Sequence, residues 1–297
     1  MLLIALEYAI LASTFTIAKK ALSYSTPFFL IATRMLVAGF LLLATAVFLG
    51  RVSWRKVCSD WFLFLQAALF HCYLAFIPEF WALQHLSSAK TSIMYAVTPF
   101  VAALLAYALR GQRLSGRKWS AMAIGVAGLV PIIWMQLQPG EVSALGQVSW
   151  PELVLLGAVT SACYAWFVVT DLMKLGHSLL TINGIAMGVG GLLSVPTFLF
   201  AEGPAWLQVT DWHSFVGWLS LLILLAHGIS YNLYGLLLTR YSIPFMTFCG
   251  FLCPLFSTVF GAYFLGEAIT WHHGASLVII TAGLTLFARA DGLKIAK

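Results

Sequence analysis

The sequence predicts an all-α integral membrane protein with ten transmembrane helices, arranged as two inverted repeats of five helices each. Three observations predict this fold: an apolar composition, ten apolar segments of membrane-spanning length, and a segment that occurs twice. Hydrophobic residues make up 61% of the 297 residues and charged residues only 9%, whereas a soluble domain carries about 25% charged residues. A soluble protein is therefore excluded, and the lipid bilayer is the expected surrounding.

Ten apolar segments are long enough to cross the hydrocarbon core of a bilayer, which is about 30 Å thick, at about 1.5 Å per helical residue. They are separated by short polar turns. The predicted spans are residues 2–22, 27–49, 61–86, 88–109, 119–135, 151–173, 179–200, 213–238, 243–265 and 271–288.

The basic residues predict the orientation of these helices. Cytoplasmic loops of membrane proteins carry an excess of Lys and Arg, so we expect both termini to be cytoplasmic in the bacterial inner membrane. Because the basic residues lie in short clusters between apolar segments, they do not indicate a nucleic-acid partner. The cytoplasmic set is Arg51, Arg55, Lys56, Arg110, Arg113, Arg117, Lys118, Lys174, Arg240, Arg289, Lys294 and Lys297, and the external set is Lys19, Lys20 and Lys90.

One segment of the chain occurs twice. A shift of 155 residues, from Pro99 to Pro254, aligns six identical residues over 31 positions, and both copies run as apolar helix, polar turn and apolar helix. Chance similarity of two apolar segments is the alternative to a duplicated half. Because five helices is an odd number, the second half enters the membrane from the opposite side. The predicted domains are residues 1–137 and 150–290, joined by the longest loop.

Two prolines predict bent helices. Pro99 and Pro254 occupy equivalent places in the two copies. A proline inside a helix frees a carbonyl group and bends the axis, which is tolerated at membrane depth mainly where protein or a water-filled cavity covers the freed group. We therefore expect the fourth and ninth helices to bend, to line a cavity and to act in gating.

The second copy carries a motif that is also found elsewhere. It consists of Pro254, Gly261, the run Leu265-Gly266-Glu267-Ala268-Ile269-Thr270, Gly274 and Ala282-Gly283. This pattern resembles the second EamA repeat of the drug/metabolite transporter superfamily, and the resemblance extends over essentially the whole chain. The first copy departs from the pattern with Gln112 and Arg113, where the family usually has an acidic residue that we interpret as structural.

The resemblance implies a secondary transporter that moves a small polar metabolite by alternating access through a central cavity, without a cofactor. The sequence agrees, since it lacks the G-x-x-x-x-G-K-[ST] loop that binds nucleotide phosphates. Substrates of the family include amino acids, nucleotide sugars and purines, so membership alone selects none of them. Proton coupling and exchange against a counter-substrate are both compatible with it.

Ionisable side chains within the spans are candidate substrate-binding residues, because a charge at the bilayer centre costs about 2.5–3.5 kcal/mol. Arg34 and Glu79 fall in the outer half of the second and third helices. They form either a structural ion pair or the cavity lining, where Arg34 meets a substrate carboxylate and Glu79 a cation. Glu7 is either a cavity residue or a hydrated carboxylate near the interface.

Two histidines, His71 and His227, lie near the middle of the third and eighth helices. Each is either a neutral imidazole bonded to a neighbouring helix or a proton carrier. No metal-ligand spacing accompanies them, so no metal site is predicted. A membrane-embedded enzyme that uses Glu79 and His71 as acid-base groups is the alternative function, but the absence of an activated nucleophile in the sequence disfavours an enzyme.

Deep aromatic residues in the spans either face lipid and pack against helices or line the cavity. Together, deep aromatic residues near two glutamates suit a cationic solute that carries a ring, through stacking and cation-π contacts. S-adenosylmethionine combines an amino-acid end, a fixed positive charge and a flat base, and the chain is also similar to the S-adenosylmethionine carriers of intracellular bacteria within this family. An ordinary amino acid is the alternative substrate. The complete set of candidate substrate-binding residues is Glu7, Arg34, His71, Phe76, Glu79, Tyr95, Trp166, Tyr231 and Asn232.

Overall fold

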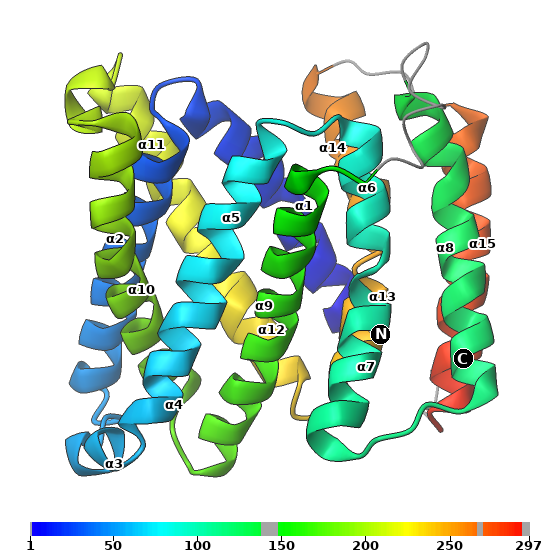
Figure 1. Ribbon diagram of the computed structural model, residues 1–297, viewed down its shortest axis with the longest axis horizontal. Coiled ribbons are helices and arrows are strands. Elements are labelled where there is room, and N and C mark those ends of the chain that lie inside the picture. Colours follow the sequence, from blue (N-terminus) through cyan, green and yellow to red (C-terminus); the bar gives the residue numbers. More distant parts are fainter. Residues whose placement is uncertain (1, 138–147, 266–269, 293–297) are drawn as a thin grey trace. The chain divides into compact units, whose positions relative to one another are not determined.

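The computed structural model describes residues 2–137, 148–265 and 270–292, and within them the chain is helical and contains no strand (Figure 1). The described residues include ten helical segments that are long and apolar enough to span a membrane. Their ends agree with the predicted spans within three residues, and the ninth span begins at Ile243 and ends with a helix that continues to Leu265. The predicted all-α fold with ten membrane spans is therefore confirmed.

Several spans consist of more than one helical element. In chain order the elements are α1 (Leu2–Leu22), α2 (Pro27–Phe48), α3 (Trp54–Ser59), α4 (Trp61–Gln66), η1 (Ala67–Tyr73), α5 (Leu74–Leu83), α6 (Ser88–Ala96), α7 (Thr98–Arg110), α8 (Gly116–Gln136), α9 (Trp150–Lys174), α10 (Leu179–Glu202), η3 (Ala205–Gln208), α11 (Trp212–Leu222), η4 (Ile223–Ser230), α12 (Tyr231–Leu237), α13 (Ile243–Cys249), α14 (Leu252–Leu265) and α15 (Trp271–Ala290).

The chain forms two compact units, and each unit contains helices from both predicted repeats. Unit 1 comprises residues 1–13, 82–163 and 241–297, and unit 2 comprises residues 14–81 and 164–240. The predicted repeats, residues 1–137 and 150–290, stay a prediction. Most of the loop between the halves, motif residues 266–269, and the predicted cytoplasmic residues Lys294 and Lys297 lie outside the described residues.

Each unit contains a pair of helices that cross at glycines. In unit 2, α2 packs against α10, and a Cβ added at Gly39 would lie 2.3 Å from the backbone nitrogen of Gly188. In unit 1, α8 packs against α15 (green and red in Figure 1), and a Cβ added at Gly283 would lie 2.9 Å from the backbone oxygen of Ala121. Small residues allow backbones to approach closely in lipid, where helix association depends on packing.

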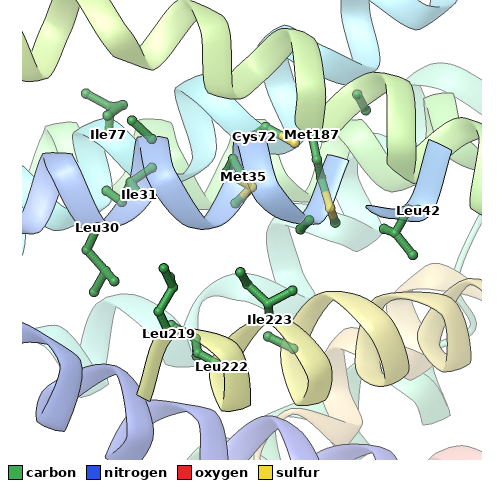
Figure 2. Close-up of a cluster of buried hydrophobic side chains, with 14 of the residues drawn as sticks. Leu30, Ile31, Met35, Leu42, Cys72, Ile77, Met187, Leu219, Leu222 and Ile223 are labelled. Atoms are coloured by element: carbon green, nitrogen blue, oxygen red, sulfur yellow. The ribbon is translucent and has the colours of Figure 1, made fainter. Parts of the chain in front are cut away.

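Apolar side chains fill the space between the helices of unit 2 (Figure 2). Leu30 and Met35 of α2 are fully buried, as are Met187 of α10 and Cys72 of η1, and Leu219 of α11 belongs to the same cluster. Lipid tails are as apolar as these side chains, so their close packing contributes more to helix association than their removal from water does. This packing holds α2, the π-helical segment η1 and α10 together.

Polar contacts fasten both ends of α10 to segments from the first half of the chain. At its C-terminal end, the Glu202 carboxylate accepts hydrogen bonds from the backbone N–H groups of Phe28 and Phe29 at 2.8 and 2.9 Å. The carboxylate thereby satisfies free N–H groups at the positive end of the α2 dipole. Just before its N-terminal end, His177 Nε2 lies 2.7 Å from an Asp60 carboxylate oxygen. Unit 2 is thus held together across the two predicted repeats.

Four of the spans are interrupted. The fourth span breaks between α6 and α7, and Pro99 lies in the first turn of α7. The ninth breaks between α13 and α14, just before Pro254. The third and eighth spans instead contain the π-helical segments η1 and η4. Sequence reasoning pointed to the proline positions but did not predict the π-helical segments.

Candidate substrate-binding site

Seven of the nine predicted site residues belong to unit 2 and lie on α2, η1, α5, α9 and α12. The other two belong to unit 1, with Glu7 buried on α1 and Tyr95 half-buried on α6. The part that Glu7 and Tyr95 play in the same site stays a prediction. The seven residues of unit 2 are Arg34, His71, Phe76, Glu79, Trp166, Tyr231 and Asn232.

Arg34 on α2 faces the residues of α5. Its guanidinium carbon lies 4.5 Å from the ring centroid of Phe76 and 5.4 Å from that of Phe80, and it interacts electrostatically with Glu79. Phe76 and Phe80 are four residues apart and Glu79 lies between them, a spacing that places all three on one face of a helix. Arg34 is only 5% exposed, so contacts of this cation are strengthened by its removal from solvent.

His71 on η1 contacts two aromatic rings from the second half of the chain. Its imidazole centroid lies 4.5 Å from the Trp166 ring, edge to face, and 4.9 Å from the Tyr231 ring. Trp166 in turn stacks on Tyr234 with a centroid distance of 4.3 Å and an interplanar angle of 30°. His71 is buried, while Trp166 and Tyr231 keep part of their surface exposed. This group of rings therefore contains one buried imidazole, that of His71, and two partly exposed aromatic side chains, Trp166 and Tyr231.

Asn232 binds the backbone of the second π-helical segment. Its Nδ2 group donates to the carbonyl oxygens of His227 and Gly228, both at 3.0 Å, and its Oδ1 atom accepts a hydrogen bond from Asn183 at 3.3 Å. Carbonyl groups that leave the regular helical pattern need such a partner inside a membrane. Asn232 thus holds the shape of η4, and the Asn183 oxygen is buried without a hydrogen-bond partner among the described residues.

Four further residues of unit 2 contact the seven predicted residues but were not among the candidates: Phe80, Asn183, His227 and Tyr234. These four residues and the seven predicted ones are called the cluster in unit 2. Helical spacing carried a signal for two of them, because Phe80 follows Phe76 by four residues and Tyr234 follows Tyr231 by three. His227 was weighed only as a neutral imidazole or proton carrier, and the structure places its ring 5.3 Å from Tyr231. Asn183 gave no local signal, since its contact is with a distant helix.

The cluster in unit 2 offers one cation, one carboxylate, neutral hydrogen-bonding groups and several aromatic faces. Among the described residues, no three His, Cys, Asp or Glu side chains are grouped so as to hold a metal ion. The arrangement is suited to bind a zwitterionic solute with a ring.

A model of the EamA-like transporter family matches residues 1–134 and 149–289, which is nearly the whole chain. The chain belongs to the EamA-like transporter family. This EamA-like protein is therefore a multi-pass membrane transporter, and its family points to transport rather than to catalysis. The expected resemblance to the drug/metabolite transporter superfamily is confirmed.

Relatives with assigned substrates are similar over most of the EamA-like chain. It is 31% identical to the S-adenosylmethionine/S-adenosylhomocysteine transporter of Chlamydia muridarum over 90% of its length and 84% of the relative. It is 30% identical to the protein of the same name from Chlamydia trachomatis serovar L2, over 90% of this chain and 82% of that one. A solved crystal structure shares the fold, with a TM-score of 0.71, 16% identity and coverage of 97% and 96% of the two chains.

Proposed function

We propose that this transporter carries S-adenosylmethionine across the bacterial inner membrane and returns S-adenosylhomocysteine in exchange. The observation that carries the proposal is the combination in unit 2 of buried Arg34, neighbouring Glu79 and partly exposed aromatic rings. The chlamydial relatives, which bear the name of transporters for these two compounds, support the choice of substrate.

The chemistry of the two compounds corresponds to the groups in the cluster. Both carry an α-carboxylate, which suits the Arg34 guanidinium, and an α-ammonium group, which suits Glu79. Both carry adenine, a flat ring that stacks on aromatic side chains. S-adenosylmethionine also has a sulfonium cation, which aromatic faces such as Phe76 and Trp166 attract through their quadrupoles. The shared groups explain how one site serves substrate and counter-substrate.

Transport by alternating access needs two bodies that move relative to each other around the substrate. The division of the chain into two compact units supports such a mechanism, as does the helix break just before Pro99 and Pro254. We propose that these breaks act in gating, that the two halves form an inverted repeat, and that both termini are cytoplasmic. An inverted repeat gives two related arrangements, one open to each side of the membrane.

Uptake into proteoliposomes tests the proposal. Purified protein is reconstituted and offered labelled S-adenosylmethionine, amino acids and nucleosides in turn, as wild type, Glu79→Gln and Asp171→Asn. Asp171 is a matched control carboxylate, because it lies at the exposed end of α9, 3.5 Å from Lys174. We expect saturable S-adenosylmethionine uptake by the wild type and Asp171→Asn, and strongly reduced uptake by Glu79→Gln.

The different compounds distinguish the possible outcomes. Uptake of an amino acid without uptake of S-adenosylmethionine would support a transport function but would identify a different substrate. Wild-type uptake of S-adenosylmethionine by the Glu79→Gln variant would show that the Glu79 carboxylate does not bind the substrate. If sealed vesicles that contain folded protein take up none of the tested compounds, the proposed transport is contradicted.

A further inference from the structure

The two π-helical segments occupy equivalent places in the two halves of the chain. His71 lies in η1, and His227 lies in η4, 156 residues later in the chain. This separation differs by one residue from the 155-residue shift that aligns Pro99 with Pro254. Single π-helical turns within α-helices occur frequently at functional sites, because the extra residue redirects side chains. Both halves therefore present a histidine from the same kind of helical irregularity.

Three ring nitrogens of these histidines, Nε2 of His71 and both nitrogens of His227, are buried without hydrogen-bond partners among the described residues. Across the described parts of the chain, few buried side-chain nitrogen or oxygen atoms lack a partner, and those in unit 2 lie on four side chains. An unsatisfied buried polar group costs about 1–3 kcal/mol, and such groups in native proteins call for an explanation. The atoms are Arg34 Nε and Nη2, His71 Nε2, Asn183 Oδ1, and His227 Nδ1 and Nε2.

Both imidazoles lie against the same tyrosine. The centroids of His71 and His227 are 4.9 and 5.3 Å from the Tyr231 centroid, with interplanar angles of 62° and 61°. Trp166 lies edge to face with His71. Both imidazoles therefore lie next to aromatic rings, an environment that suits a flat, uncharged ring.

The charges around the two histidines favour recognition by neutral groups. His227 interacts electrostatically with Arg34 and His71 and lies beside the Tyr231 ring, while Arg34 also interacts with Tyr231, Glu79 and Cys72. A protonated imidazole would add a second cation beside buried Arg34, which is unfavourable at low dielectric. A neutral imidazole carries one N–H donor and one acceptor nitrogen. Two such rings match a ligand edge that also offers both a donor and an acceptor.

We infer that His71 and His227 form the base-recognising edge of the substrate site, where they bind the amino-pyrimidine or imidazole edge of adenine while Trp166 and Tyr231 cover its face. Adenine presents an exocyclic amino donor next to a ring-nitrogen acceptor. The Asn183 Oδ1 atom is a further acceptor for the amino group. The inference rests on the proposed function, and it assigns selectivity for a 6-aminopurine to the two histidines.

Ligand binding to the purified, detergent-solubilised protein tests the inference independently of transport. Thermal unfolding is followed while S-adenosylhomocysteine, or S-inosylhomocysteine with an oxygen in place of the 6-amino group, is titrated to obtain each dissociation constant. The variants are His71→Phe and His227→Phe, which keep a ring of similar shape, and His71→Gln, which restores one hydrogen-bonding group. His213→Phe is the matched control, because His213 is exposed at the start of α11.

We expect the wild type and His213→Phe to bind the amino compound about 10-fold to 100-fold more tightly than the oxo compound. The phenylalanine variants should reduce this ratio to about threefold or less, and His71→Gln should recover part of it. Equal binding of both compounds by the wild type, or an unchanged ratio in folded phenylalanine variants, would overturn the inference and leave the proposed substrate intact. Failure of S-adenosylhomocysteine to stabilise the wild type at all would overturn both.

If one phenylalanine variant fails to fold, the other tests the inference, since each histidine is expected to contribute to the preference for the amino compound. An unchanged ratio in the folded variant overturns the inference.

Discussion

Replacing Arg34 by methionine removes the guanidinium but keeps a long apolar stem against Phe76 and Phe80. The Nε and Nη2 atoms of Arg34 are buried without a hydrogen-bond partner among the described residues. These two N–H groups point to the same side of the guanidinium and form the fork that binds a carboxylate through two parallel hydrogen bonds. The geometry therefore predicts that Arg34 recognises the α-carboxylate of the substrate.

The size of the effect follows from these contacts. Hydrogen bonds to charged groups contribute about 1.5–3 kcal/mol, and loss of about 3 kcal/mol corresponds to a change of about 100-fold in the dissociation constant. Arg34→Lys keeps the charge but loses the fork, so we expect an intermediate loss of about 10-fold. Both estimates apply only to ligands that carry the carboxylate.

The assay compares two competitors of labelled S-adenosylmethionine uptake: unlabelled S-adenosylmethionine and its decarboxylated form, which lacks only the carboxylate. The wild type should prefer the intact compound by about 100-fold, and Arg34→Met should have little preference. Size-exclusion chromatography and the unfolding temperature establish that the variant is folded. A folded Arg34→Met protein with the wild-type preference would refute this reasoning and make Arg34 a structural partner of Glu79.

Three further predictions concern the fold and the orientation. Gly39→Ala should destabilise the protein by about 1–3 kcal/mol, because its Cβ would lie 2.3 Å from a backbone atom of Gly188, whereas Gly188→Ala should be tolerated, because its own Cβ meets nothing within 4 Å. Glu202→Gln removes the charge that caps α2 and should cost about 1–2 kcal/mol. Single cysteines at Arg113 and Lys20, in a protein without its five native cysteines, should react from the cytoplasmic and the external side respectively.

Thermal unfolding in detergent measures the first two predictions, and labelling of intact cells with a membrane-impermeant maleimide measures the third. Equal stability of the two alanine variants would mean that the helices adjust their separation at this crossing. An unchanged unfolding temperature in Glu202→Gln would show that the cap contributes little. Labelling of both cysteines from the same side would contradict the orientation derived from the basic residues.

The spans were predictable because each depends on a local property of the chain. A segment of about 20 apolar residues satisfies its own backbone as a helix in lipid, whatever its neighbours are. The helix breaks near Pro99 and Pro254 were foreseeable for the same reason, since proline lacks an N–H group and obstructs the preceding turn. Arg34 and Glu79 stood out because charges are rare at membrane depth.

The features that escaped sequence reasoning depend on contacts between distant residues. The π-helical segment η4 carries no local marker, and Asn232 bonds to two of its carbonyl groups. The contact between Asn183 and Asn232 joins two helices. The composition of the two compact units follows from which helices pack closely, such as α2 on α10, and small residues at many places along the chain gave no unique pairing.

Photolabelling with 8-azido-S-adenosylmethionine, followed by mass spectrometry of the labelled peptides, tests the central claim that the cluster in unit 2 binds the substrate. We expect labels on peptides that contain His71, Trp166 or Tyr231, and we expect excess S-adenosylhomocysteine to suppress them. Labels confined to segments of unit 1 and suppressed by the same competitor would place the substrate outside this cluster.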